Sequence, residues 1–84
     1  MKFRAHINIM PRPELLDPQG KATTSGLKTM GFTAIDNLRI GKRISLEIEA
    51  KDAAEAGARV DEACQKLLAN LIMESYEVEL VALN

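Results

Sequence analysis

Two strictly alternating segments, each followed by a stretch with helical periodicity, constrain the fold more than any other feature of this chain. Every second side chain of residues 2–10 is apolar, and these are Phe3, Ala5, Ile7 and Ile9. Residues 43–50 repeat the pattern with Ile44, Leu46, Ile48 and Ala50. A period of two is typical of a strand with one buried face. Both segments are therefore predicted to be strands of one sheet.

A helix is predicted between these two strands. Asp17 and Pro18 provide an N-cap and a first helical residue, and Gly31 is suited to the left-handed position that ends a helix. The run 22–26 (Ala-Thr-Thr-Ser-Gly) is a poor helix former. We therefore expect this helix to depend on tertiary or subunit contacts for its stability.

A second helix and two further strands complete the predicted order. Asp52 and Glu55 form a capping box, and the periodicity that follows extends to about Asn70. Residues 33–40 are predicted to be the second strand and residues 76–80 the last one. The resulting order is β-α-β-β-α-β, without a linker or a low-complexity tract.

This order predicts a ferredoxin-like α+β sandwich formed by residues 1–84 as a single domain. In that fold a four-stranded antiparallel sheet carries both helices on one face, with the first and third strands in the centre. The other face is open. It is expected to hold Arg4, His6 and Asn8 beside Glu47 and Glu49, so that charges balance across strands.

Charge and cysteine content exclude several classes of function. Lys and Arg number 11 against 12 Asp and Glu, and the net charge of −1 argues against nucleic acid or an anionic membrane as partner. One cysteine, Cys64, allows neither an internal disulfide nor a multi-thiolate metal site. The N-terminus lacks the apolar run of a signal peptide, and a cytoplasmic location is expected.

No residue pattern predicts catalysis by this chain alone. His6, the single histidine, has no evident nucleophile or second acid–base group near it, and we expect it to be a half-solvated or interface residue. Cys64 is expected to be a buried small hydrophobe rather than a reactive thiol. Neither the dinucleotide fingerprint nor the P-loop spacing is present. We therefore expect no catalytic, cofactor-binding or metal-binding residue.

Three features point instead to assembly. Gly20 lies in the first turn of the first helix, where it costs about 1 kcal/mol relative to alanine, and the close approach of another backbone would explain it. The weak first helix is the second feature. The third is the C-terminal strand, in which Val81 and Leu83 fall on the face expected to be polar. An edge strand that is apolar on both faces is a candidate for pairing with another chain.

Several blocks of the sequence together resemble the PurS family. These blocks are Asp17–Ala22, Met30–Phe32, Leu38–Lys42, Cys64–Asn70 and Glu74–Val78. The resemblance extends in register over nearly the whole chain. In one departure, Leu71 stands where the family usually has a proline, which leaves the end of the second helix less constrained.

The resemblance implies a non-catalytic role inside an enzyme. PurS-like chains are small subunits of phosphoribosylformylglycinamidine (FGAM) synthase, a glutamine-dependent C–N ligase of purine biosynthesis. The family bridges a glutaminase subunit and a large synthetase subunit, assists the passage of ammonia and forms dimers or tetramers. ATP and magnesium are expected on the large subunit, and no cofactor is expected on this chain.

The resemblance and the three assembly features together give a set of expected subunit contacts. Residues 17–21 and 39–42 are expected to contact the larger subunits, and the edge strands to make the self-association. The ten candidates are Asp17, Pro18, Gln19, Gly20, Lys21, Arg39, Gly41, Lys42, Val81 and Leu83. A Gly20→Val variant is expected to remain folded and to form the complex more weakly.

Two alternatives remain open from the residues. The first is a ferredoxin-like regulatory domain that binds a small metabolite between paired sheets, which ligand-dependent stabilisation would reveal. The second is a small hydrolase of the acylphosphatase type. It would need an arginine in a glycine-rich first loop, whereas Arg12 lies between two prolines.

Overall fold

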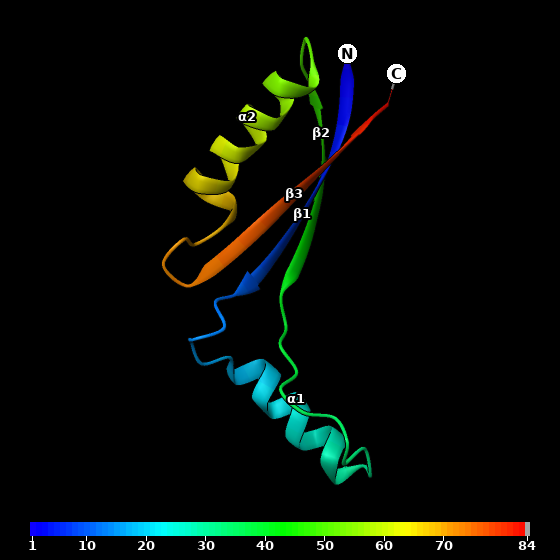
Figure 1. Cartoon of the computed structure of the whole chain (residues 1–84), viewed down its shortest axis with the longest axis vertical. Helices are drawn as coiled ribbons and strands as arrows, with labels where there is room; N and C mark the ends of the chain where they lie inside the picture. The colour runs from blue at the N-terminus through cyan, green and yellow to red at the C-terminus, as the bar shows by residue number, and fades with distance from the viewer. Residues whose placement is uncertain (84) are drawn as a thin grey trace.

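The computed structural model describes residues 1–83 and shows an elongated molecule with two parts (Figure 1). One part is a sheet covered by a helix, and the other is an arm that extends from one end of the sheet. The elements are β1 (Lys2–Pro11), α1 (Pro18–Thr29), β2 (Lys42–Glu49), α2 (Ala53–Ala63), a π-helical turn η1 (Cys64–Leu68) and β3 (Glu74–Ala82). The principal extents are 51 × 27 × 14 Å.

The sheet is antiparallel, with the order β2-β1-β3 and β1 in the centre. Ala5 of β1 faces Leu46 of β2 on one side and Leu80 of β3 on the other. The predicted first and third strands are confirmed to within one residue at each end, because their alternation separates a buried face from an exposed one. The last strand is longer than predicted and begins at Glu74.

The core lies between α2 and one face of the sheet. Its fully buried side chains come from both layers and are Ala5, Ile7, Ile9, Ala56, Val60 and Cys64. Asp52 caps α2 as predicted, because its side chain accepts a hydrogen bond from the Glu55 N–H group at 2.8 Å. The α2 helix packs on β3 and β1, and it makes no substantial contact with β2. The β2 half of the apolar face is therefore left without a helix.

The predicted four-stranded sheet is wrong, because residues 33–40 do not form a strand in the described chain. The Leu38 N–H group donates to Thr24 Oγ1 and the Ile40 N–H group donates to Asp17 Oδ2. These two main-chain donors are therefore not free to form hydrogen bonds with a neighbouring strand. Asn37 has φ of 53°, which interrupts an extended backbone. Residues 33–40 instead run back along α1 to the sheet.

The predicted packing of both helices on one sheet face is also wrong. The α1 helix continues away from the end of β1 and makes no substantial contact with the sheet or with α2. We call residues 12–41, which contain α1 and the returning segment, the arm. The predicted helix ends are confirmed: Asp17 caps α1, and Gly31 has φ of 103°. Within residues 1–83, no helix has the length and apolar character needed to cross a bilayer.

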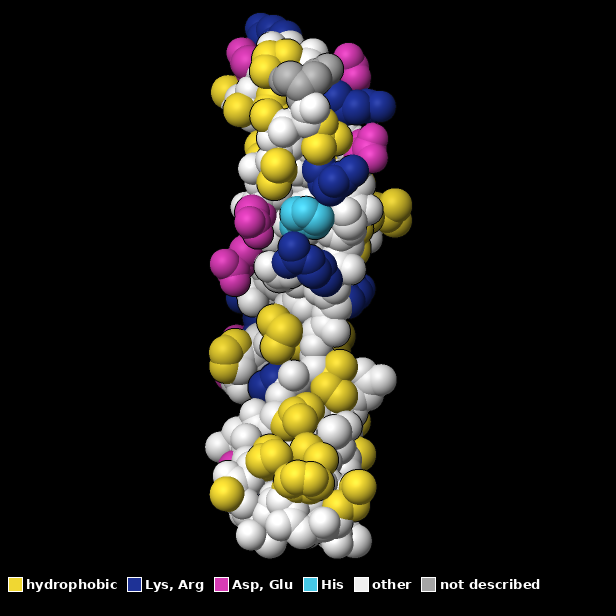
Figure 2. All heavy atoms as spheres, turned by 90° about the vertical axis from the view of Figure 1, so that its right-hand side faces the viewer, with side chains coloured by type: hydrophobic (Ala, Val, Ile, Leu, Met, Phe, Trp, Pro, Cys, Tyr) yellow, Lys and Arg dark blue, Asp and Glu magenta, His cyan; other side chains and the backbone are white. Residues whose placement is uncertain are grey.

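The open sheet face carries charged side chains, as predicted. Arg4 binds Glu47 across the strands at 3.3 Å, and Lys2 lies 3.5 Å from the same carboxylate. Figure 2 shows the single histidine among basic and acidic side chains on this face, with hydrophobic side chains gathered over the arm below it. The exposed large apolar residues of the arm are Leu16, Met30, Phe32 and Ile35.

Candidate functional site

The two ends of the arm meet at a compact junction, formed by residues 12–17, Gly20 and residues 38–41, which includes four of the ten predicted contact residues. Asp17 is its centre and is only 8% exposed. Its carboxylate accepts hydrogen bonds from the Gly20 N–H group at 3.1 Å and the Ile40 N–H group at 2.9 Å. Both bonds lower the pKa of the Asp17 carboxyl below its usual value, and the bond from Ile40 has the larger effect. Asp17 thus starts α1 and fixes the returning segment.

Arg39 also connects the segment before α1 to the segment that returns to the sheet. Its Nη2 donates to the carbonyl oxygens of Arg12 at 2.9 Å and Leu15 at 3.0 Å. Its Nε lies 3.9 Å from Asp17 Oδ2. The guanidinium therefore binds main-chain oxygens inside this chain, and Arg39 holds the junction together rather than presenting a free charge to a partner.

Gly20 and Gly41 have an intrachain explanation that sequence reasoning missed. A Cβ on Gly20 would lie 2.2 Å from the Leu38 carbonyl oxygen, and one on Gly41 would lie 2.1 Å from the Ile9 carbonyl oxygen. The backbone that approaches Gly20 is therefore that of the same chain. A Gly20→Val variant is therefore expected to be destabilised, because any side chain at this position would collide with the main chain of the returning segment.

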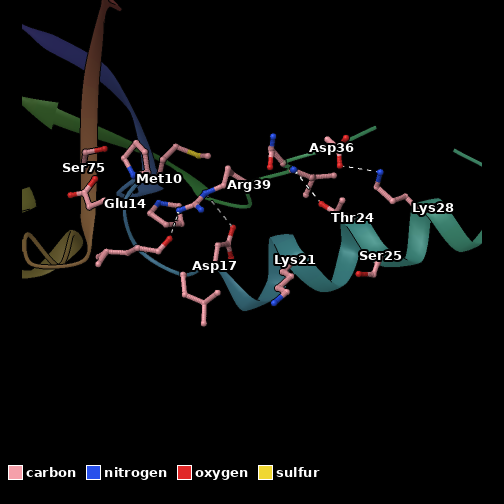
Figure 3. Close-up of a pocket in the computed structure, with 16 residues that line it drawn as sticks. Met10, Glu14, Asp17, Lys21, Thr24, Ser25, Lys28, Asp36, Arg39 and Ser75 are labelled. Carbon is pink, nitrogen blue, oxygen red and sulfur yellow. Dashed lines mark hydrogen bonds and ion pairs between the residues drawn. The ribbon is translucent and has the colours of Figure 1, made fainter. Parts of the chain in front are cut away.

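An open groove of about 1040 Å³ lies beside the junction, between the arm and the end of the sheet (Figure 3). Lys21, Thr24, Ser25 and Lys28 line it from α1, and Lys28 binds Asp36 at 3.0 Å. Its charged side chains are mostly paired with each other, Lys28 with Asp36 and Arg39 with Asp17, and they form no convergent catalytic group. The groove is therefore suited to contact with a polar protein surface more than to chemistry.

The ten predicted contact residues fall into two groups. Asp17, Gly20, Arg39 and Gly41 form the junction, and their roles lie within the chain. Pro18, Gln19, Lys21, Lys42 and Val81 are exposed, and Leu83 is half-buried. Lys42 forms an ion pair with Glu74 at 3.7 Å. The exposed members lie at the start of α1, at the start of β2 and on the outer face of β3.

Arg12 was missed as a structural residue. Its Nε and Nη2 donate to the Leu71 carbonyl oxygen at 3.1 and 2.7 Å, which fixes the turn before β3 to the end of β1. An arginine between two prolines was the available signal, because a rigid backbone on both sides reduces the entropy lost when the side chain is held.

Three further titratable groups do not form one site, because His6 lies on the open sheet face whereas Cys64 and Tyr76 lie in the core near Asp61. His6 is half-buried on the open face, and its Nδ1 atom is buried without a hydrogen-bond partner. Cys64 is buried in the core, and this burial raises the pKa of its thiol. The Tyr76 hydroxyl donates to Asp61 Oδ1 at 2.5 Å. Among the described residues, no group of three or more His, Cys, Asp or Glu side chains is placed to hold a metal ion.

Comparison with known proteins identifies the family. The family model PurS, described as phosphoribosylformylglycinamidine (FGAM) synthase, matches residues 4–82. The chain belongs to the PurS family. This membership confirms the resemblance of the sequence to PurS-type subunits of FGAM synthase.

Relatives of the PurS family match in sequence and in structure over nearly the whole chain. The PurS subunit of Synechocystis is 42% identical over 81 residues, which cover 96% of this chain and 81% of the relative. A solved Bacillus subtilis PurS structure is 34% identical with a TM-score of 0.87, and it covers 95% of this chain and 99% of its own. A chain of the Thermotoga maritima PurLQS structure is 33% identical with a TM-score of 0.89, over 96% and 99%.

Proposed function

We propose that this PurS chain is the small non-catalytic subunit of FGAM synthase, bridging the glutaminase and synthetase subunits and assisting ammonia transfer. The observation that carries the proposal is the family match over residues 4–82. The likeness to a chain of the Thermotoga PurLQS structure supports assembly with two other kinds of subunit. ATP and magnesium belong to the large subunit in this proposal, and the complex works in the cytoplasm.

The shape of the molecule supports a bridging role. The chain is 51 Å long and presents two separate surfaces, a charged sheet face and an arm that exposes hydrophobic side chains. Ammonia released by one subunit is lost if it reaches bulk water before it reacts. A narrow protein packed along the seam between two larger subunits reduces that loss without a catalytic group of its own.

The exposed start of α1 is the surface we assign to the larger subunits. Pro18, Gln19 and Lys21 are exposed there, beside the groove, while their neighbours Asp17 and Gly20 hold the helix in place. Self-association to a dimer or tetramer is a further part of the proposal.

Glutamine-dependent amidine formation by the purified glutaminase and synthetase subunits tests the function, with and without this chain. We expect glutamine-dependent activity only when the chain is added, and ammonia-dependent activity in both cases. Equal glutamine-dependent activity without the chain would contradict the bridging role. In that event a metabolite-binding role would be the one to test, by ligand-dependent stabilisation.

A charge reversal tests the assigned surface. Lys21→Glu should lower the glutamine-dependent rate at limiting subunit concentration, because it reverses an exposed charge at the proposed contact. Lys66→Glu is the matched control, since Lys66 is also exposed, lies on η1 and forms an ion pair with Glu62 at 3.8 Å. Equal effects of the two variants would argue against this surface.

A further inference from the structure

Two arginines form a continuous hydrogen-bonded path across one end of the sheet. Arg39, in the segment that returns to β2, donates from Nη2 to the Arg12 carbonyl oxygen at 2.9 Å. Arg12 directly follows β1, and its guanidinium donates to the Leu71 carbonyl oxygen in the turn before β3. Since β1 lies between β2 and β3, this path joins all three strands at the end from which the arm extends (Figure 1). We call it the arginine relay.

The relay is also attached to the arm. The second acceptor of the Arg39 Nη2 atom is the Leu15 carbonyl oxygen at 3.0 Å, and Arg39 Nε lies 3.9 Å from Asp17 Oδ2, where α1 begins. Among residues 1–83, α1 makes no substantial contact with the sheet or with α2. The direction of the arm therefore depends mainly on the relay and on the hydrogen bonds of Asp17, and little on packing against the sheet.

Loss of the relay should change the direction of the arm more than the stability of the sheet. The core beneath α2 is made of other side chains, among them Ile7, Val60 and Cys64. The α1 helix has 12 residues and is about 18 Å long, so a rotation of about 10° at the junction moves its far end by about 3 Å. A displacement of that size is large for a protein interface, whose core is packed as densely as a protein interior.

The direction of the arm is shared with solved PurS structures. The Bacillus subtilis and Thermotoga maritima chains match 95% and 96% of this chain, although about two thirds of the aligned residues differ. The arm, residues 12–41, is too large a part of the chain to lie outside such a match. Its direction relative to the sheet is therefore kept where most side chains have changed, which indicates that the direction itself matters.

We propose that Arg39 is a positioning residue for glutamine coupling, and that it acts through Arg12 to hold the arm at the angle that keeps two neighbouring subunits sealed against each other. The inference rests on the proposed bridging function and names the element of the chain that sets its efficiency. In a bridge the arm and the sheet contact different neighbours, so the angle between them fixes how those neighbours meet. A gap between them lets ammonia escape to bulk water before it reacts.

The yield of amidine per glutamate released tests this role in the complete complex of glutaminase, synthetase and this chain. At saturating chain concentration, Arg39→Gln should lower the yield at least about twofold, while glutamine hydrolysis and ammonia-dependent synthesis stay unchanged. Arg39→Lys should recover part of the yield, because an ammonium group can still donate to main-chain oxygens but lacks the planar fork of arginine. Arg59→Gln, at an exposed position of α2, removes the same charge outside the relay and should keep the full yield.

Arg12→Gln provides an independent test, because it removes only the exposed bonds to Leu71 and leaves the Arg39 bonds to main-chain oxygens in place. A relay predicts a similar loss of yield from Arg12→Gln and little further loss in the double variant. All variants are first checked for native circular dichroism. If Arg39→Gln does not fold, Arg12→Gln and Arg39→Lys still give the answer.

Four results would overturn the positioning role. They are an unchanged yield in the relay variants, an equal loss in Arg59→Gln, additive losses in the double variant, and a loss that excess chain restores, which would mean that Arg39 acts on assembly alone. The proposed function stands in each case as long as glutamine-dependent activity needs the unmodified chain. If that activity does not need the chain, the proposed function fails together with this inference.

Discussion

At the residue scale, a few small or buried groups decide where the arm begins and how it leaves the sheet. Asp17 binds two main-chain N–H groups that belong to different segments, and Arg39 binds two main-chain oxygens. Gly20 and Gly41 let the segments come this close. A DPQGK block reads as a helix start in the sequence, and that part was predictable. Its second role at the junction depends on residues more than 20 positions away.

Gly20→Ala should destabilise the chain by more than about 1 kcal/mol, because its Cβ would lie 2.2 Å from the Leu38 carbonyl oxygen. Gly57→Ala is the control. A Cβ at Gly57 meets only Leu80 Cδ1 at an ordinary 3.6 Å, so this variant should gain about 0.5–1 kcal/mol from helix propensity. Urea unfolding at equal protein concentration measures both. Destabilisation by both changes to the same extent would refute this explanation of Gly20.

Tyr76 should titrate above its usual value of 10.0, because its hydroxyl donates to Asp61 and is partly buried. The chain has one tyrosine and no tryptophan, so absorbance at 295 nm reports this group alone. Asp61→Asn should move the midpoint back toward 10.0. Because the folded pKa is raised, the stabilisation holds below pH 10 and is lost as the pH rises through the folded pKa. An unchanged midpoint in the variant would count against the hydrogen bond as the cause.

At the element scale, the end of the second helix shows how a side chain distant in the sequence fixes a turn. The α2 helix passes into the π-helical turn η1, which the Ala69 N–H group closes by donating to the Cys64 carbonyl oxygen at 3.0 Å. Arg12 then holds the carbonyl of Leu71, the position at which the resemblance led us to expect a proline. The side chain that directly follows β1 thus fixes this turn.

Two Ile→Val substitutions, one buried and one exposed, measure how much the packing between α2 and the sheet contributes to stability. Ile7→Val should destabilise the chain by about 0.5–1.5 kcal/mol, since Ile7 is fully buried in the central strand. Ile72→Val should change stability by less than about 0.5 kcal/mol, because Ile72 is 84% exposed in the turn before β3. Urea midpoints give both values. Similar losses at the two positions would mean that the turn is buried in solution, by a partner.

At the scale of the whole molecule, the arm and the sheet are joined mainly through the junction. Elsewhere the arm packs on itself, since α1 covers only the segment that returns to β2. The relative position of the two parts therefore depends on a few hydrogen bonds to one carboxylate and one guanidinium. An extended two-part shape of this kind is well suited to contact several neighbours.

Lowering the pH should weaken the connection between the arm and the sheet at the junction. The folded pKa of Asp17 is depressed, so its stabilisation is complete above its usual value of 3.8 and is lost as the pH falls through the lower folded value. Asp17→Asn should be less stable than the unmodified chain at pH 6, and the difference should shrink below pH 4. Asp36→Asn, at an exposed ion pair, is the control. Urea midpoints from pH 6 to 3 measure this, and a constant difference would contradict it.

The sequence by itself determined the family, both helix starts and the strands β1 and β2. These depend on neighbours in the chain, because capping and alternation act within a few residues. Only the tertiary structure decided that residues 33–40 form no strand and that α1 points away from the sheet. Residues 33–40 lie where the predicted order of elements needs a strand, but Thr24 and Asp17 bind the N–H groups of Leu38 and Ile40 instead. Which partner a backbone group binds depends on what lies nearby in space, and no local pattern records it.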